Sequence, residues 1–476
     1  MKTRTAALGF VLLTGIAAAR LAHAEEDVRR LARDVFRQLI EIDTTESTGS
    51  TSGAARAMAA RLKDAGFPDA DVVVVGPDDR HGNVVARLRG SGARRPILFA
   101  AHLDVVEARR EDWSVDPFRF QEKDGYYYGR GTTDIKDGDA ILVTNLIRLA
   151  REKYRPDRDL IVALTAGEET GIADGIEWLL KERRPLIDAA YCVNLDGGDF
   201  QSKQDRRYLV AVQASEKLSV HFRLEATDRG GHSSLPRPEN PIYRVAAAIS
   251  RVAAYEFPVE LNEVTRAYFD RMSLLETGRT AADMKAITAA SPDAAASKRL
   301  SESPYANALL RTTCVATRLD AGHANNALPQ RARALVNCRV LPGRDPEEVR
   351  KTLARVVGDE KIAVVGPVVD WDRPGQSAIA PPARLGPELV RAVEKVGSEM
   401  WPGVPVVPTM ETGGSDGYYL RPAGIPTFGV SGVFIDMDDV RAHGKDERVG
   451  VESFHEGVEF HYRLMKVLSS APRGGA

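Results

Sequence analysis

The sequence predicts an α/β protein with a central, mostly parallel sheet covered by helices on both faces and with a smaller α+β domain inserted into it. In residues 26–200, and again after residue 375, strand-like apolar runs alternate with amphipathic helical stretches. Between these regions, strands alternate apolar and polar residues, which is typical of a sheet with one exposed face. At 476 residues, of which 43% are hydrophobic, the chain is long enough to form both domains.

In the first region, near-continuous apolar runs predict strands that are buried on both faces, and a 3.6-residue periodicity predicts helices. The predicted strands are 71–75, 83–88, 96–101, 160–166 and 189–195. The predicted helices are 28–42, 135–154 and 172–182. Strands separated by helices in this way pair in parallel, because the helix carries the chain back across the sheet.

The inserted region predicts a two-layer sandwich of two helices and antiparallel strands. Its predicted helices are 240–254 and 346–357, and its predicted strands are 217–226, 331–340 and 361–369. Residues 258–312 are polar, helical and rich in Ala and Ser, so we expect them to decorate this insert. The later alternation consists of helices 385–397, 415–421 and 452–468 and strands 404–407 and 426–430. We therefore predict one large domain, 25–214 with 375–476, split by an insert at 215–374.

The N-terminus predicts a secretory signal peptide over residues 1–24. Lys2 and Arg4 precede an apolar run at 6–19, and Ala22-His23-Ala24 forms a small-x-small cleavage site. An uncleaved membrane anchor is the alternative, although Arg20 interrupts the run before it reaches the roughly 20 residues of a spanning helix. We expect export to the periplasm or the medium, with no membrane span after cleavage.

The three cysteines are too few for a disulfide framework. Cys192 and Cys338 lie in apolar strand-like runs, which favours buried free thiols. A bridge between Cys314 and Cys338 is the alternative in an oxidising compartment.

The overall charge is close to neutral, with 65 basic and 67 acidic residues interleaved along the chain. Phosphate binding requires a clustered excess of Lys and Arg, so nucleic acid is not expected as a partner. We therefore expect the functional site to be a local cluster of side chains.

Carboxylates and histidines recur where predicted strands end. In the stretch LIVALTAGEETG at 160–171, Glu168 and Glu169 follow directly after the end of a predicted buried strand. The other residues of this kind are His102, Asp104, Asp134, Asp196 and His443. Because α/β sheets bind ligands at the carboxyl ends of their strands, these side chains should converge there. Unpaired carboxylates would repel one another, whereas two divalent cations could share them; this donor set suits Zn²⁺, with Co²⁺ or Mn²⁺ as alternatives.

Six short motifs carry a resemblance to a known family. They are H-x-D, G-R-G-x-x-D-x-K, G-E-E-x-G, G-H-S-S, N-x-L-P and H-G-x-x-E, in this order. Over residues 30–465 the sequence resembles the co-catalytic zinc metallopeptidases, which include glutamate carboxypeptidase, aminoacylase, acetylornithine deacetylase and succinyl-diaminopimelate desuccinylase. The resemblance implies an exopeptidase that hydrolyses short peptides through a hydroxide bridging two Zn²⁺ ions. An N-acyl-amino-acid deacylase of the same fold is the alternative.

The resemblance also implies a role for each residue at the strand ends. The implied metal ligands are His102 and Asp196 at one site, Glu169 and His443 at the other, and Asp134 between them. Glu168 is the implied general base, which accepts a proton from water and passes it to the leaving nitrogen. Asp104 is implied to fix the ring orientation of His102.

The same resemblance implies that the insert is a lid and dimerisation domain. It also implies further site residues in this domain. His232 would reach from the lid of a partner subunit and stabilise the developing oxyanion. Asn326 would contact substrate, and Arg339 or Arg373 would anchor a substrate carboxylate by bidentate pairing. Outside the insert, Gly414 in the Gly-rich loop 413–417 would also contact substrate. A homodimer is therefore expected.

Two other functions are alternatives to a metallopeptidase. Residues 413–417 fit G-x-S-x-G, so Ser415 could act with Asp436 or Asp438 and His443 as a serine hydrolase. Residues 409–412 separate the predicted strand from Ser415, however, and little sheet follows it. A non-catalytic binding module that kept the fold is the other alternative, and the intact set of ligands and base argues against it.

Overall fold

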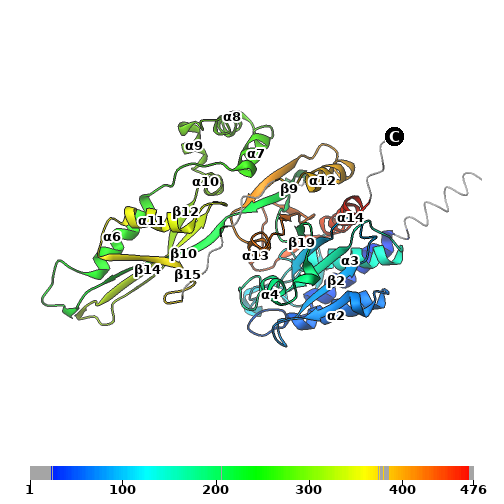
Figure 1. Cartoon of the computed structure of the whole chain (residues 1–476), viewed down its shortest axis with the longest axis horizontal. Coiled ribbons are helices and arrows are strands. Elements are labelled where there is room, and N and C mark those ends of the chain that lie inside the picture. Colours follow the sequence, from blue (N-terminus) through cyan, green and yellow to red (C-terminus); the bar gives the residue numbers. More distant parts are fainter. Residues whose placement is uncertain are drawn as a thin grey trace, which may run out of the picture. The chain divides into compact units, whose positions relative to one another are not determined.

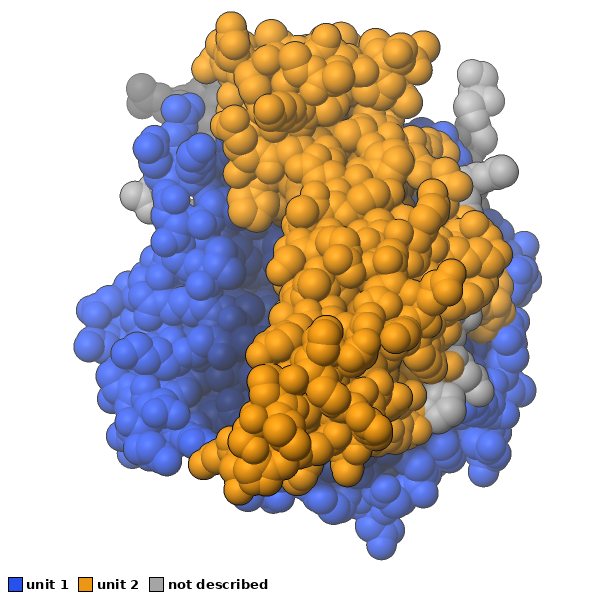
Figure 2. Space-filling view, turned by 90° about the vertical axis from the view of Figure 1, so that its left-hand side faces the viewer, with its two compact units in different colours: residues 1–211, 387–406, 427–476 blue, residues 212–386, 407–426 orange. Residues whose placement is uncertain are grey.

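The computed structural model describes residues 23, 25–204, 206–373, 375, 379 and 385–470 (Figure 1). Two compact units are distinguished, and Figure 2 colours them separately. Unit 1 comprises residues 1–211, 387–406 and 427–476, and unit 2 comprises residues 212–386 and 407–426. Unit 2 contains all of the predicted insert, and it also includes residues 407–426, which we had predicted to belong to the large domain.

The predicted signal peptide lies outside the described residues, except for His23. Among the helices that the structure describes, none is both long enough and apolar enough to cross a membrane.

Unit 1 is built on the predicted mostly parallel sheet, which confirms the fold class. The strand order is β1 (Val72–Val75), β2 (Asn83–Leu88), β6 (Leu160–Thr165), β3 (Ile97–His102), β7 (Cys192–Asn194), β17 (Thr427–Gly429), β9 (Arg206–Glu216), β8 (Phe200–Lys203) and β18 (Phe434–Asp436). β6, β3, β7 and β17 pair in parallel. β1 and β2 pair antiparallel, as do β2 and β6. All residues of β3 and β6 are buried, which explains their unbroken apolar runs.

Helices flank this sheet in Figure 1. They are a first helix at 25–40, α2 (Thr51–Asp64), α3 (Lys136–Arg151), α4 (Gly175–Glu182), α5 (Arg184–Ile187), α12 (Pro387–Met400) and α14 (Val451–Leu468). A three-stranded antiparallel sheet was not predicted; it consists of β4 (Gln121–Lys123), β5 (Tyr126–Tyr128) and β19 (Arg448–Gly450). Its strands are only three residues long, too short to show a two-residue alternation.

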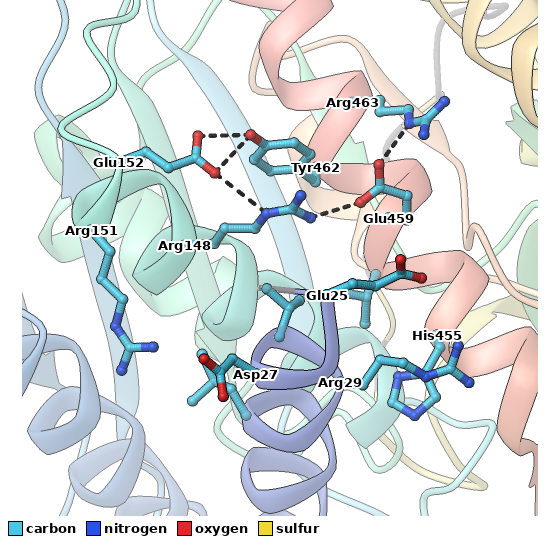
Figure 3. A pocket seen from close by; sticks show the side chains of 13 residues that line it. Glu25, Asp27, Arg29, Arg148, Arg151, Glu152, His455, Glu459, Tyr462 and Arg463 are labelled. Atoms are coloured by element: carbon cyan, nitrogen blue, oxygen red, sulfur yellow. Dashed lines mark hydrogen bonds and ion pairs between the residues drawn. The ribbon is translucent and has the colours of Figure 1, made fainter. Parts of the chain in front are cut away.

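A cavity of about 680 Å³ lies in unit 1 between the first helix, α3 and α14 (Figure 3). Its charged side chains largely satisfy one another. Arg148 pairs with Glu459 at 2.7 Å, and the hydroxyl of Tyr462 donates to Glu152 at 2.7 Å. Neither metal-ligand set described below borders this cavity, so it is not part of the candidate centre.

Unit 2 contains the predicted two-layer sandwich. Four antiparallel strands lie in the order β12 (Thr313–Ala321), β14 (Arg331–Val340), β10 (Leu218–Thr227) and β15 (Ile362–Val368). Helices α6 (Pro241–Ala254) and α11 (Pro346–Val357) pack on one face and bury its apolar residues, including Phe222 and Val336. A separate two-stranded ribbon pairs β11 (Gly231–His232) with β13 (Ala327–Leu328).

The polar stretch 258–312 forms four short helices, as its composition predicts. They are α7 (Glu263–Met272), α8 (Gly278–Ile287), α9 (Ala294–Leu300) and α10 (Pro304–Leu310). The buried amine of Lys217 donates to the carbonyls of Ala308 and Arg311, at 2.9 and 2.8 Å, and to the hydroxyl of Thr313 at 3.1 Å. Lys217 therefore ties the end of α10 to the start of β10.

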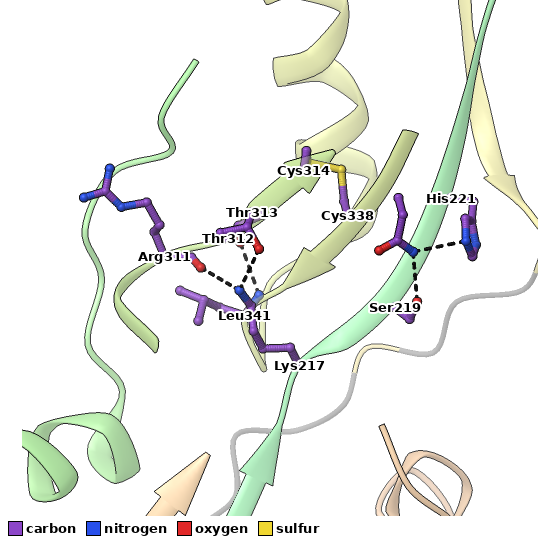
Figure 4. Close-up of a disulfide and its surroundings, with 10 residues drawn as sticks. Lys217, Ser219, His221, Arg311, Thr312, Thr313, Cys314, Cys338 and Leu341 are labelled. Carbon is purple, nitrogen blue, oxygen red and sulfur yellow. Dashed lines mark hydrogen bonds between the residues drawn. A yellow bond between two sulfur atoms is a disulfide. The ribbon is translucent and has the colours of Figure 1, made fainter. Parts of the chain in front are cut away.

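The prediction that Cys338 is a free thiol is wrong. Cys314 and Cys338 face each other across β12 and β14 and form a disulfide (Figure 4). β12 was not predicted as a strand, because a bulge between Ala316 and Arg318 interrupts its alternation, so the sequence did not show this cross-strand pairing. Cys192 is buried and is not part of this disulfide, as predicted.

Candidate metal centre

The five predicted ligands lie at strand ends and loops of unit 1. His102 is the last residue of β3, and Asp196 lies two residues after β7. Asp134 lies two residues before α3, and His443 precedes β19. Glu169 follows the sharp turn at Gly167, whose φ of +77° favours glycine and where a Cβ would collide with the carbonyl of Ile172. The parallel strands bring these segments to one edge of the sheet.

The ligands form two groups that share Asp134. One group is His102, Asp134 and Asp196, and the other is Asp134, Glu169 and His443; within each, one potential ligand atom per residue lies within 4.8 Å of the others. Asp134 Oδ1 is 3.2 Å from His102 Nε2, whereas Asp134 Oδ2 is 2.9 Å from His443 Nε2. The two oxygens of Asp134 thus face different histidines, as a bridging carboxylate requires.

Asp104 holds the centre in a different way from the one predicted. The ring of His102 is fixed by the main chain, because Nδ1 donates to the carbonyl of Asp104 at 3.0 Å while the nearer carboxylate oxygen is 3.8 Å away. The carboxylate of Asp104 instead accepts the backbone amides of Glu168 and Glu169, at 3.3 and 3.1 Å. Asp104 therefore orients the ring through its carbonyl and the two glutamates through its carboxylate.

The charges of this cluster are strongly coupled. A hydrogen bond to Asp134, together with the charge of Glu169, raises the pKa of His443 to about 9. Burial opposes the charge of Asp134, but the two histidines outweigh it and lower the pKa of this carboxyl. Burial raises the pKa of Asp196 to about 8 and also raises the pKa of Glu169. Carboxylates crowded at this edge therefore require a compensating positive charge.

The residues fit a pair of divalent cations. The buried Nε2 of His102 faces Asp134 Oδ1 at 3.2 Å, and because Nδ1 donates to the carbonyl of Asp104, a neutral His102 ring would present its Nε2 lone pair to a metal. Each group offers imidazole nitrogen and carboxylate oxygen and no thiolate, a donor set that suits zinc and neighbouring transition metals.

Glu447 was matched to a motif but given no role, and the structure supplies one. Its buried carboxylate accepts the guanidinium of Arg130 at 2.5 Å and the amides of Gly131 and Thr133, at 3.2 and 2.8 Å. Arg130 also donates to the carbonyl of Gly444 at 3.0 Å. These bonds join the turn before Asp134 to the loop of His443, so Glu447 fixes two ligand-bearing segments together. Its place in H-G-x-x-E, four residues after a ligand, was the available signal.

The candidates of unit 2 are held much more loosely. His232 and Asn326 lie on or next to the paired strands of the ribbon, where Ser233 N donates to the carbonyl of Asn326 at 3.0 Å and both residues are exposed. Arg339 is half-buried on β14, its side chain makes no hydrogen bond or ion pair with any described residue, and burial lowers its pKa. Arg373 lies exposed in a turn, and Gly414 lies exposed in the loop after β16 (Val406–Glu411).

The contacts of Ser415 argue against the serine hydrolase. Its hydroxyl is buried and donates to the carboxylate of Glu216 at 2.7 Å. The histidine assigned to it in that alternative, His443, contacts Asp134 and Glu169 instead. Ser415 therefore has a structural hydrogen bond in place of a general base.

Comparison with known proteins identifies the family. Residues 98–467 match the model of Peptidase family M20/M25/M40. The human N-fatty-acyl-amino acid synthase/hydrolase PM20D1 is 29% identical over 383 residues, which cover 78% of this chain and 74% of that protein.

Two solved structures share the fold. The metallo-carboxypeptidase Sso-CP2 of Sulfolobus solfataricus has a TM-score of 0.67 at 17% identity, covering 92% of this chain and 99% of the other. The YXEP protein of Bacillus subtilis, described as a dinuclear metal binding peptidase, has a TM-score of 0.57 at 12% identity, covering 93% and 99%. With a paired-metal ligand set and a family match over most of its length, the chain belongs to Peptidase family M20/M25/M40 and is a hydrolase of C–N bonds.

Proposed function

We propose that this protein is a zinc-dependent amidohydrolase that cleaves N-acyl amino acids or short peptides bearing a free carboxylate. The sharing of Asp134 between two ligand groups carries this proposal, because these groups would hold two cations near the carboxylate of Glu168, whose Oε2 is 4.0 Å from His102 Nε2. Similarity to a relative named as an N-fatty-acyl-amino acid synthase/hydrolase favours acyl amino acids over peptides as the first substrates to test.

The chain's own residues would divide the work as follows. When bound, the two cations would lower the pKa of a water molecule towards about 7 and polarise the scissile carbonyl. Glu168 lies with Oε2 4.0 Å from His102 Nε2, and its amide is fixed by Asp104. The Glu168 carboxylate accepts the proton of the attacking water and delivers it to the leaving nitrogen. His232, which would reach the site from the lid of a partner subunit, would donate to the oxyanion that develops on the carbonyl.

Arg339 supports a substrate with a free carboxylate. A guanidinium that is half-buried without a counter-ion is unfavourable in the free protein, so an anion from outside would stabilise it. The exposed Arg373 has no such reason to bind an anion, and we therefore assign the carboxylate to Arg339.

A substrate panel tests the function. Purified protein loaded with zinc is assayed with N-acetyl and N-lauroyl amino acids, free dipeptides, and the same compounds with the carboxylate amidated. We expect hydrolysis of the free acids, loss of activity with phenanthroline, and little hydrolysis of the amidated forms. Inhibition by a fluorophosphonate would instead support Ser415, and zinc binding without any turnover would support a non-catalytic binding module.

Export to an oxidising compartment is part of the proposal. The charged start, apolar run and Ala22-His23-Ala24 site support a cleaved signal peptide. The Cys314–Cys338 bridge supports it independently, because such bonds persist mainly outside the cytosol. N-terminal sequencing of protein from the cell envelope or medium should begin at Glu25; an intact Met1 would contradict export by cleavage.

We also propose a homodimer formed through unit 2. β12 is an edge strand of its sheet, and Val315 and Leu319 on it are 61% and 63% exposed. An exposed apolar edge strand promotes aggregation unless another strand covers it. Analytical ultracentrifugation should give twice the chain mass, and Leu319→Lys should give the monomer.

A further inference from the structure

The loop between β16 and α13 (Gly417–Leu420) contains two glycines that the fold itself does not require. Neither Gly413 nor Gly414 has a positive φ, and a Cβ added to either would meet no described atom within 4 Å. Glycine costs stability through backbone entropy, so its presence here needs a reason outside the packing of the chain. A ligand that approaches the bare backbone closely would supply one.

Both ends of this loop are bound to the same two consecutive residues. Before the glycines, the amide of Lys217 donates to the carbonyl of Glu411 at 3.0 Å. After them, the hydroxyl of Ser415 donates to the carboxylate of Glu216 at 2.7 Å. Glu216 and Lys217 therefore fix the two ends of the loop, while Gly414 between them stays exposed.

Glu216 is itself held from two other directions. Arg421 forms a buried ion pair with it, Nη1 to Oε1 at 2.6 Å, and the amide of Gln213 donates to Oε2 at 3.3 Å. Arg421 reaches this position because Gly417 has no side chain, since a Cβ at Gly417 would collide with the guanidinium. Buried networks of charged hydrogen bonds fix their members in one arrangement.

We propose that Glu216 is the positioning residue of the Gly413-Gly414 loop, in which the family resemblance already implies that Gly414 contacts substrate. This inference rests on the proposed function for the choice of substrates. The hydrogen bonds that hold the loop to Glu216 do not depend on that function. Ser415, which the sequence singled out as a nucleophile, acts as the hydrogen-bond donor that joins the loop to Glu216. An added methyl group at Gly414 reduces the space for substrate without disturbing the fold.

The experiment compares Glu216→Gln, Ser415→Ala and Gly414→Ala, with Glu225→Gln as the matched control. Glu225 lies on β10, the next strand along the chain, and pairs with Arg223 on the same strand at 3.4 Å. We expect KM to rise at least about 10-fold in Glu216→Gln and Gly414→Ala and about 3-fold in Ser415→Ala. The value of kcat and the zinc content should change less than 2-fold, and the control should match the wild type.

Hydrogen exchange of residues 412–418 gives a readout that does not depend on activity. Glu216→Gln and Ser415→Ala should increase exchange there, whereas Gly414→Ala should not. Unchanged exchange and unchanged KM in Ser415→Ala, the mildest variant, would overturn the inference, and so would loss of zinc or a 100-fold loss of kcat. If the wild type hydrolyses no amide, the proposed function fails while the exchange of these variants still decides the role of Glu216.

Discussion

The candidate residues of the two units are held in opposite ways. In unit 1, the metal ligands are bound on several sides: Asp104 holds the amides of Glu168 and Glu169, and Glu447 holds the turn before Asp134. In unit 2, Arg339 has no counter-ion among the described residues, and His232 is exposed. Residues of the first kind are preorganised by the fold, whereas under the proposed function residues of the second kind would gain their contacts when substrate binds. The consequences of mutation should differ accordingly.

The largest effect is expected at Glu168. Glu168→Ala should lower kcat by about 100- to 10,000-fold, because the attacking water loses its proton acceptor. Metal content should stay at the wild-type level, since the ligand groups do not include Glu168. Kinetics and metal analysis on the same sample check this, with Glu177→Ala on α4 as the control. Activity within 10-fold of the wild type would remove Glu168 from the mechanism.

The role of Glu447 provides the next test of preorganisation. Glu447→Gln should lower metal affinity by about 10- to 100-fold, because it loosens the segments that bear Asp134 and His443. At saturating zinc, kcat should recover to near the wild-type value, which separates positioning from chemistry. Competition with a chelator of known affinity measures this. The control is Glu456→Gln on α14. This change breaks the half-exposed ion pair between Glu456 and Arg207 of β9, and the variant should bind metal normally.

Arg339 tests the prediction for the loosely held residues of unit 2. Arg339→Ala should raise KM by about 10- to 100-fold for substrates with a free carboxylate and leave kcat and thermal stability nearly unchanged. Arg333→Ala on the same strand should lower stability instead, because Arg333 pairs with Asp320 and stacks on Trp371. A loss of stability in Arg339→Ala with no change in KM would assign Arg339 to the fold.

The last prediction concerns the stability of unit 1 in acid rather than its activity. His461 is fully buried and donates to the carbonyl of Ser431 at 3.0 Å, and burial lowers its pKa to about 4. The unfolded chain binds a proton near pH 6.5 and the folded chain does not, so stability is complete above about pH 6.5 and falls as the pH drops to 4. The loss should be about 3 kcal/mol. Urea unfolding at several pH values measures it, and His461→Gln should flatten this dependence; an unchanged slope would exclude His461 as the cause.

The sequence was sufficient to predict features that depend on local pattern. The buried runs of β3 and β6 are uninterrupted, and β14 and α11 begin and end at the predicted residues. The carboxyl-edge rule then placed His102 and Glu169 together, because parallel strands end at the same edge.

Features that depend on register or on turn geometry were not predictable in this way. The Cys314–Cys338 bridge follows from the pairing of β12 with β14, and β12 contains a bulge that obscures its alternation. The contacts of Asp104 depend on how the turn at Gly167 presents two amides. The hydrogen bonds of Glu447 cross more than 300 residues of sequence, so no local pattern could show them.

The central claim is that Asp134 is shared by two metal sites, and metal stoichiometry tests it most directly. Wild-type protein dialysed against zinc should retain two equivalents per chain by plasma mass spectrometry, and His443→Ala, which removes a ligand of one site only, should retain about one. Asp134→Ala should retain none, because both sites lose a ligand at once. If Asp134→Ala kept one full equivalent, or if the wild type bound only one, the two ligand groups would not share this carboxylate and the account would be contradicted.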